Sequence, residues 1–200
     1  MRAEGRAQAL AEAQFCEAIL AKTGDTVLTA TLQGAETVLH WDHFPKGDVI
    51  DRANGATWFY HCHPPGRETR ADPRAEHGHF HCFLRPNDAK GPLHHLIALG
   101  VDAQGRPLRF FTVNHWVVGD DWLAAEPTIA MLPQFDVHLA RPCYLVNRWL
   151  TAMIRAYEPQ ITMLIAERDQ RILAQGRDEN ESRQDRSLEV TSELWIDAQE

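Results

Sequence analysis

The sequence predicts an α+β domain in which about four antiparallel strands form one sheet, flanked by an N-terminal helix and long C-terminal helices. Both ends of the chain are rich in residues that favour helices. The middle consists of short runs of alternating apolar and polar residues, separated by turn-forming residues, which is typical of antiparallel strands. This order of elements favours an α+β arrangement, in which the sheet could also curl into a barrel-like form.

The first helix is predicted over residues 3–22, because Ala, Glu, Gln and Leu dominate that stretch. The run Thr23-Gly24-Asp25 ends it, and Asp25 is expected to cap a second short helix that reaches Leu32. Residues 41–55 are interpreted as a loop, since proline, glycine, aspartate and asparagine recur there.

Four strands are predicted in the middle of the chain, at residues 57–63, 77–85, 95–102 and 108–118. The stretch 64–76 is rich in proline, glycine and arginine and is interpreted as a connection between the first two strands. Apolar residues return to helical spacing at 143–157 and again at 161–175, so two helices are expected after the sheet.

One domain is expected over residues 1–176, with a histidine-rich sheet at its centre, at about 41–122. Residues 177–200 contain eight acidic residues and three arginines, a net charge of −5, and are interpreted as a solvated acidic tail. Truncation after Gly176 is therefore expected to leave the fold and any metal content unchanged.

Charge and hydropathy exclude several classes of protein. The formal net charge is −8, and the chain has no basic stripe of the kind that binds nucleic-acid backbones. No apolar run approaches the roughly 18 residues that a membrane span needs, and the N-terminus lacks the apolar core of a signal peptide. We therefore expect a cytoplasmic protein without nucleic-acid or membrane partners, which could form homo-oligomers. Its four cysteines should be reduced, and none forms a Cys-x-x-Cys pair.

Eleven histidines occur in the chain, and their clustering between His61 and His81 predicts a metal site. Side chains two residues apart share one face of a strand. Neighbouring imidazoles on one face can converge on a single ion, with metal–nitrogen bonds of about 2.0–2.1 Å. The predicted ligands are His61, His63, His79 and His81, with His77, Glu68, Glu76 and His115 in reserve.

Glu68 or Glu76 is expected to serve as a further ligand or as a general base. Arg85 follows the alternation of the second histidine strand, and it could hold an anionic substrate because arginine forks suit carboxylates and phosphates. Metal binding should weaken below about pH 6, since an imidazole must be neutral to ligate. The alternative for all these histidines is a surface or hydrogen-bonded core role.

Residues 55–68, Gly-Ala-Thr-Trp-Phe-Tyr-His-Cys-His-Pro-Pro-Gly-Arg-Glu, resemble the first motif of the cupin family. That motif is a glycine, five residues, His-x-His, three or four residues and a glutamate. The resemblance implies a β-barrel that often holds Fe(II), Mn(II), Ni(II) or Zn(II), with His115 in the order of the later cupin histidine. The chain departs from the family because the Pro-x-Gly of the second cupin motif is absent around residues 108–116.

A second resemblance covers a longer stretch, at about residues 41–122. It rests on the strings Trp41-Asp-His-Phe-Pro, Tyr60-His-Cys-His, Glu76-His-Gly-His-Phe-His-Cys-Phe and Asn114-x-Trp116. Together these strings are similar to a bacterial family of unassigned function. The resemblance therefore implies an uncharacterised family and supplies no reaction.

The function expected from the sequence is that of a small non-haem metalloenzyme, an oxygenase of the Fe(II) type that acts on a small anionic or aromatic substrate. Imidazoles with at most one carboxylate suit one transition-metal ion, iron first and then zinc, copper, nickel or manganese, rather than magnesium or calcium. Two alternatives stay open: a non-catalytic module that binds metal or haem, and a structural histidine-rich domain without a ligand.

Overall fold

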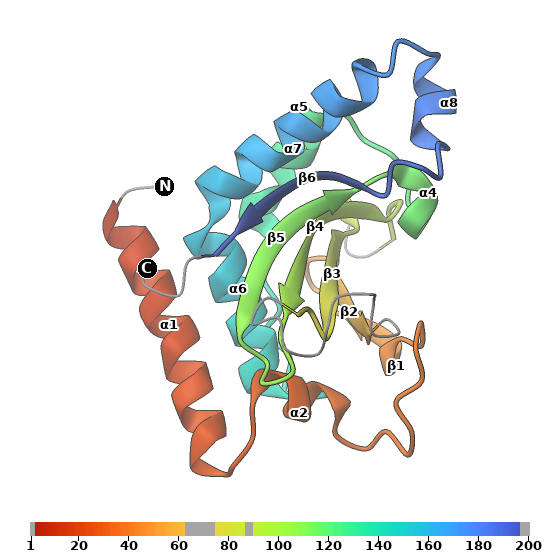
Figure 1. The fold of residues 1–200 in the computed structure, drawn as a ribbon. Coiled ribbons are helices and arrows are strands. Elements are labelled where there is room, and N and C mark those ends of the chain that lie inside the picture. The colour runs from red at the N-terminus through yellow and green to blue at the C-terminus, as the bar shows by residue number, and fades with distance from the viewer. Residues whose placement is uncertain (1–2, 63–74, 87–89, 197–200) are drawn as a thin grey trace.

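The computed structural model describes residues 3–62, 75–86 and 90–196 (Figure 1). Within these residues, six antiparallel strands form one open sheet, and each strand pairs with the next one along the chain. The strands are β1 (Phe44–Ile50), β2 (Ala56–Cys62), β3 (Gly78–Leu84), β4 (His94–Val101), β5 (Pro107–Val113) and β6 (Val190–Trp195). β1 and β6 are the two edges, so the barrel-like form considered from the sequence is wrong.

Helices flank both faces of the sheet. Figure 1 shows the long helices α1, α6 and α7 along one side of the sheet, and the short helix α4 near the other. The helices are α1 (Ala3–Lys22), α2 (Val27–Leu32), α4 (His115–Val118), α5 (Ala125–Met131), α6 (Tyr144–Ala156), α7 (Glu158–Leu173) and α8 (Glu179–Arg183), with a 3-10 turn at Leu132–Gln134. None of the helices in the described ranges combines the length and the apolar character that crossing a membrane requires.

The main core lies between the sheet and the long helices. Every second residue of β2 and β3 points into it, including Trp58 and Phe80, and Trp149 of α6 packs against Phe80 with 5.8 Å between ring centroids. Buried tryptophans need partners for their indole N–H groups. Trp58 Nε1 donates to Asn147 Oδ1 at 2.9 Å, and Trp149 Nε1 donates to Glu17 Oε1 of α1 at 2.7 Å. These bonds fix α6 to the sheet and α1 to α6.

The helices are close to those predicted from composition and periodicity. α1 has the predicted bounds, and α6 and α7 begin and end within a few residues of the predicted helices. The cap of α2 is Thr26 rather than Asp25: the Thr26 hydroxyl accepts from the backbone N–H of Thr29 at 3.2 Å. Asp25 instead accepts a hydrogen bond from the Thr29 hydroxyl at 3.2 Å.

The four predicted strands are present with small shifts, except where the fourth ends. Residues 114–118, predicted as strand, turn into α4, because the Asn114 side chain accepts from the N–H of His115 and caps a helix. The predicted loop at 41–55 contains edge strand β1. Gly47 and Asp48 have positive φ angles of 86° and 56°, and they form an irregularity within β1 rather than ending it.

The segment from residue 177 onward differs from the solvated tail that its charge predicts. It contributes α8 and β6, and β6 pairs with β5 from Arg109↔Trp195 to Val113↔Val190. Thr191 is buried, and Leu194 packs against the main core. The acidic side chains of an alternating strand can face solvent while its backbone groups pair with a neighbouring strand. The net charge of the segment therefore does not prevent strand pairing.

Candidate metal centre

The sheet face opposite the long helices carries a group of histidines. His61 of β2 lies directly across from His79 of β3, and His81 lies across from Phe59. The core residues Tyr60, Phe80 and Cys82 alternate with them, so the strand parity predicted for these histidines holds. Antiparallel pairing then brings the side chains of the two strands into contact.

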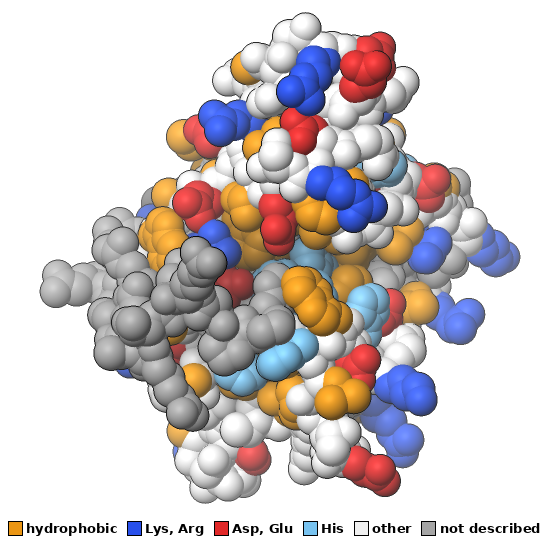
Figure 2. Space-filling view, turned by 45° about the vertical axis from the view of Figure 1, so that its right-hand side comes forward, with side chains coloured by type: hydrophobic (Ala, Val, Ile, Leu, Met, Phe, Trp, Pro, Cys, Tyr) orange, Lys and Arg blue, Asp and Glu red, His pale blue; other side chains and the backbone are white. Residues whose placement is uncertain are grey.

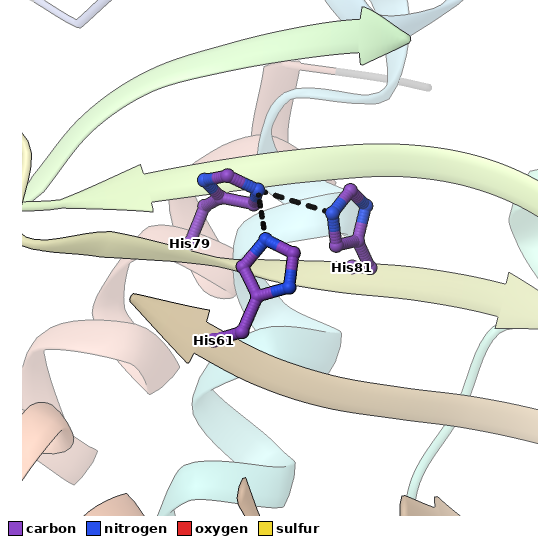
Figure 3. A group of neighbouring side chains, drawn as sticks. All are labelled: His61, His79 and His81. Carbon is purple, nitrogen blue, oxygen red and sulfur yellow. Dashed lines mark hydrogen bonds between the residues drawn. The ribbon is translucent and has the colours of Figure 1, made fainter. Parts of the chain in front are cut away.

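The Nε2 atoms of His61, His79 and His81 converge on one point (Figure 3). The Nε2 of His79 lies 2.8 Å from that of His61 and 3.0 Å from that of His81. All three ligand atoms lie within 4.8 Å of one another. Metal–nitrogen bonds of about 2.0–2.1 Å place neighbouring ligand nitrogens roughly 3 Å apart. These three residues, hereafter the triad, could therefore hold one metal ion.

Each of the two buried triad histidines has an outer partner at its other ring nitrogen. Glu76 Oε1 lies 2.7 Å from Nδ1 of His79. An ionised carboxylate can only accept, so a neutral His79 ring carries its proton on Nδ1 and presents a lone pair at Nε2. His81 Nδ1 lies 3.0 Å from Nε2 of His95, which can accept in the same way. Both contacts orient the rings with Nε2 toward the triad centre.

Burial keeps the imidazoles of His81 and His95 neutral. Burial, together with the neighbouring His79 and His95, lowers the pKa of His81 well below its ordinary value. Burial likewise lowers the pKa of His95 to about 3. Burial alone would raise the pKa of Glu76, but the hydrogen bond and charge of His79 and the charge of Arg109 bring that pKa below its ordinary value. At neutral pH His81 and His95 thus present uncharged rings near the ionised carboxylate of Glu76.

Glu76 is held over Gly100, between His79 and Arg109. His79, Gly100 and Arg109 pair in succession across β3, β4 and β5. A Cβ atom at Gly100 would lie 2.4 Å from Glu76 Oε2, so the glycine leaves room for the carboxylate. Arg109 Nε donates to Glu76 Oε2 at 2.8 Å, and its Nη1 donates to Glu193 Oε2 at 2.6 Å. This row of contacts links the triad to β6.

The structure brings together three of the four ligands predicted first from the sequence. His61, His79 and His81 meet, whereas His63 and Glu68 lie outside the described residues. Glu76 is present as the partner of His79 Nδ1 rather than as one of the atoms at the triad centre.

His77 is engaged elsewhere. Its Nδ1 lies 2.6 Å from the hydroxyl of Tyr60, a residue of the core face. β3 begins at Gly78, so the alternation that aligns His79 and His81 does not extend to His77. A Cβ at Gly78 would lie 2.4 Å from the Tyr60 hydroxyl, so this glycine permits the contact.

His115 and Arg85 also have partners away from the triad. His115 is the first residue of α4, and its Nε2 lies 2.9 Å from the carbonyl oxygen of Asp120. Arg85 follows the last residue of β3, and its guanidinium donates to the carbonyl oxygen of Gly91 at 3.3 Å.

His95 is the residue of the site that the sequence does not single out. Simple alternation along β4 would place it with Ile97 and Leu99 on the core face. The register shifts between β3 and β4, because Cys82 pairs with Ile97 while Phe83 pairs with His95. The extra residue, Leu96, turns His95 toward the histidine face. No sequence pattern marks this irregularity in advance.

A pocket of about 330 Å³ opens beside the triad. Its lining includes His61 and His81 together with Phe59, Phe83, Val117 and Val118. Figure 2 shows histidine side chains gathered around a hollow that hydrophobic side chains border. A larger groove of about 940 Å³ runs along residues 31–37 and 42–48, and no triad histidine lines it among the described residues. Of these two pockets, the smaller one gives access to the triad.

Comparisons with curated proteins and with solved structures return no significant match. A family model described as a domain of unknown function (DUF6969) matches residues 7–196. The match takes in all six strands and the long helices, a longer stretch than the 41–122 expected from the sequence strings. The chain therefore belongs to this uncharacterised family, DUF6969.

Proposed function

We propose that the protein is a mononuclear non-haem metalloenzyme whose ion is bound by the Nε2 atoms of the triad. The observation that carries the proposal is the convergence of these atoms beside a pocket. His79 Nε2 has one lone pair but faces His61 and His81 at 2.8 and 3.0 Å. One lone pair accepts one well-directed hydrogen bond. A metal ion would instead take one lone pair from each ring.

The ligand set favours a transition metal in an open site. Neutral imidazoles suit iron, zinc, copper or nickel better than magnesium or calcium. Structural zinc sites have four protein ligands, whereas catalytic sites keep a position for water or substrate. The three ligands found among the described residues leave such a position. The ion would supply Lewis acidity or redox chemistry there, and iron is our first choice, as expected from the sequence.

The surrounding residues have roles that follow from their contacts. Glu76 uses one oxygen for His79 and the other for Arg109, so we assign it a positioning role rather than that of a general base. His95 orients His81 from the other side. Phe59 and Phe83 line the pocket beside the proposed ion.

A haem suits the triad less well. A porphyrin occupies four coordination positions of its iron and leaves two positions on opposite faces. The three nitrogens of the triad instead lie side by side, with two of their separations at 2.8 and 3.0 Å. A structural metal site is the stronger alternative, and metal content together with the response to ligand removal separates the two.

The direct test is elemental analysis and a visible spectrum of protein purified without a histidine tag and without oxygen. We expect one equivalent of a single transition metal per chain and no Soret band. Protein that stays metal-free after incubation with Fe(II), Zn(II), Cu(II), Ni(II) and Mn(II) in turn would exclude the proposal. A Soret band would favour the haem alternative instead.

The Gly100→Ala variant is expected to bind metal roughly 10–100-fold more weakly, which is the usual effect of disturbing an outer partner of a metal-bound histidine. The added methyl group would meet the Glu76 carboxylate and push it from His79. Glu76→Gln should act in the same direction, because an amide is a poorer acceptor for the Nδ1 proton. Competition with a chelator measures the affinity, and one equivalent should still bind at saturation. Unchanged affinity in both variants would contradict the role given to Glu76.

A further inference from the structure

We infer that the pocket beside the triad binds a small, neutral aromatic molecule of one or two rings, which reaches the metal ion through a lone-pair donor atom. The inference rests on the proposed metal site and deepens it by naming the class of substrate. Size, wall chemistry, charge and backbone conformation each support it.

The volume of the pocket limits the ligand. At about 330 Å³ it is roughly twice the cavity of about 150 Å³ that holds a benzene molecule in an apolar protein interior. One or two fused rings therefore fit. His61 and His81 both line the pocket, so a ligand inside it lies next to the proposed ion.

The wall of the pocket is built largely from aromatic rings that stack on one another. Phe59 stacks on His43 with 3.6 Å between ring centroids and 8° between planes. Phe83 stacks on Phe59 at 5.5 Å and 27°. Val117 and Val118 of α4 add aliphatic surface to the same lining. Rings of this kind favour planar aromatic ligands, since stacking adds to the gain from burying apolar area.

The described lining of the pocket offers an anionic ligand no basic side chain. Among the described residues, its lining contains no lysine or arginine, and its charged member is Asp48. Asp48 Oδ1 lies 2.9 Å from Nδ1 of His43, which occupies the carboxylate. Arg85, predicted from the sequence to hold an anion, is not among the described lining residues. Of the two substrate classes expected from the sequence, the pocket therefore favours the aromatic one.

The backbone conformation of Trp41 also supports a binding site in this pocket. Trp41 lines the pocket and has a positive φ angle of 71°, a conformation that bulky residues rarely adopt. Its N–H donates to the carbonyl oxygen of Cys62 at 3.0 Å, and its ring meets that of His61 edge-on at 5.9 Å. Strained backbone that holds an aromatic ring next to a proposed ligand is typical of binding sites.

The test uses the full chain loaded with Co(II), whose visible spectrum changes when a ligand binds to the ion. Metal content is measured first, and benzimidazole, imidazole and benzoate are then titrated at pH 8. Benzimidazole is a weaker base than imidazole, so donor strength alone would favour imidazole. We expect benzimidazole to bind at least about tenfold more tightly than imidazole, because its second ring is buried in the pocket, and benzoate to bind more weakly than benzimidazole.

A matched pair of variants assigns the preference to the pocket. Val117→Phe should fill the lining and abolish the preference for benzimidazole, whereas the same change at the exposed Val38 should leave it unchanged. The comparison of probes in the unaltered protein is decisive even if Val117→Phe does not fold. Equal binding of imidazole and benzimidazole, or tighter binding of benzoate, overturns the inference and leaves the metal site standing. A chain that takes up no Co(II) overturns both.

Discussion

Replacing His61 or His79 with alanine is expected to lower metal affinity by at least about 100-fold, more than the loss of an outer partner does. Each change removes one of three converging nitrogens and leaves only two ring ligands from the triad. His77→Ala is the matched control, because His77 directly precedes β3 but contacts Tyr60 instead. Its metal content should equal that of the unaltered protein. Elemental analysis and chelator competition measure both quantities.

The response of the fold to these changes separates a catalytic site from a structural one. His61 is only partly buried, so His61→Ala should cost little stability in the metal-free protein. If the site is catalytic, circular dichroism and urea unfolding should show a folded variant that has lost its metal. If unfolding accompanies metal loss in both variants, the ion is structural. Full metal content in both variants would end the proposal that the triad binds it.

Ending the chain after Glu189 is expected to lower the melting temperature by about 10 °C, from a loss on the order of 3 kcal/mol. The truncation removes β6, opens the edge of β5, and takes away the packing of Leu194 against the core. It also removes Glu193, the second carboxylate partner of Arg109, so metal affinity should fall as well. The sequence alone predicts the opposite result, with fold and metal content intact.

Two further variants isolate the contributions of β6. A chain that ends after Ile196 keeps the strand and should melt like the full chain. Glu193→Gln keeps the strand pairing but weakens the contact with Arg109. It should therefore lower the metal affinity while leaving the melting temperature close to that of the full chain. Scanning calorimetry on the full chain and these three variants decides the question. Equal melting temperatures for the full chain and the Glu189 truncation would instead support the interpretation of this segment as a solvated tail.

The elements that sequence predicts well are those whose pattern is local. α1 and α6 show their composition and spacing within single stretches, and β2 to β5 alternate between short connections. β1 is interrupted at Gly47 and Asp48, and its turn-forming residues make it resemble a loop in the sequence. β6 is concealed for another reason: its surroundings are acidic, and its partner β5 is distant in the sequence.

The same distinction applies to the candidate metal centre. Alternation alone places His79 and His81 on one face, and this requires no knowledge of the fold. The meeting of His61 with His79 depends on the pairing register of β2 with β3, which alternation does not determine. The outer partners of the triad are still harder to predict from sequence. The orientation of His95 depends on a register shift between β3 and β4, and Arg109 lies on β5, beyond β4.

The place of β6 in the sheet also has a consequence for the order of folding. β2 to β5 join through neighbouring hairpins, but Arg109 and Glu193 are 84 positions apart. Contacts over such a distance form slowly, because a long intervening chain must first be ordered. The edge of β5 therefore stays unpaired until a late stage of folding. An unpaired edge can form a strand pair with a second molecule. Pairing of β6, the strand that carries the Glu193 partner of Arg109, thus also ends the stage of folding at which this chain is most prone to aggregate.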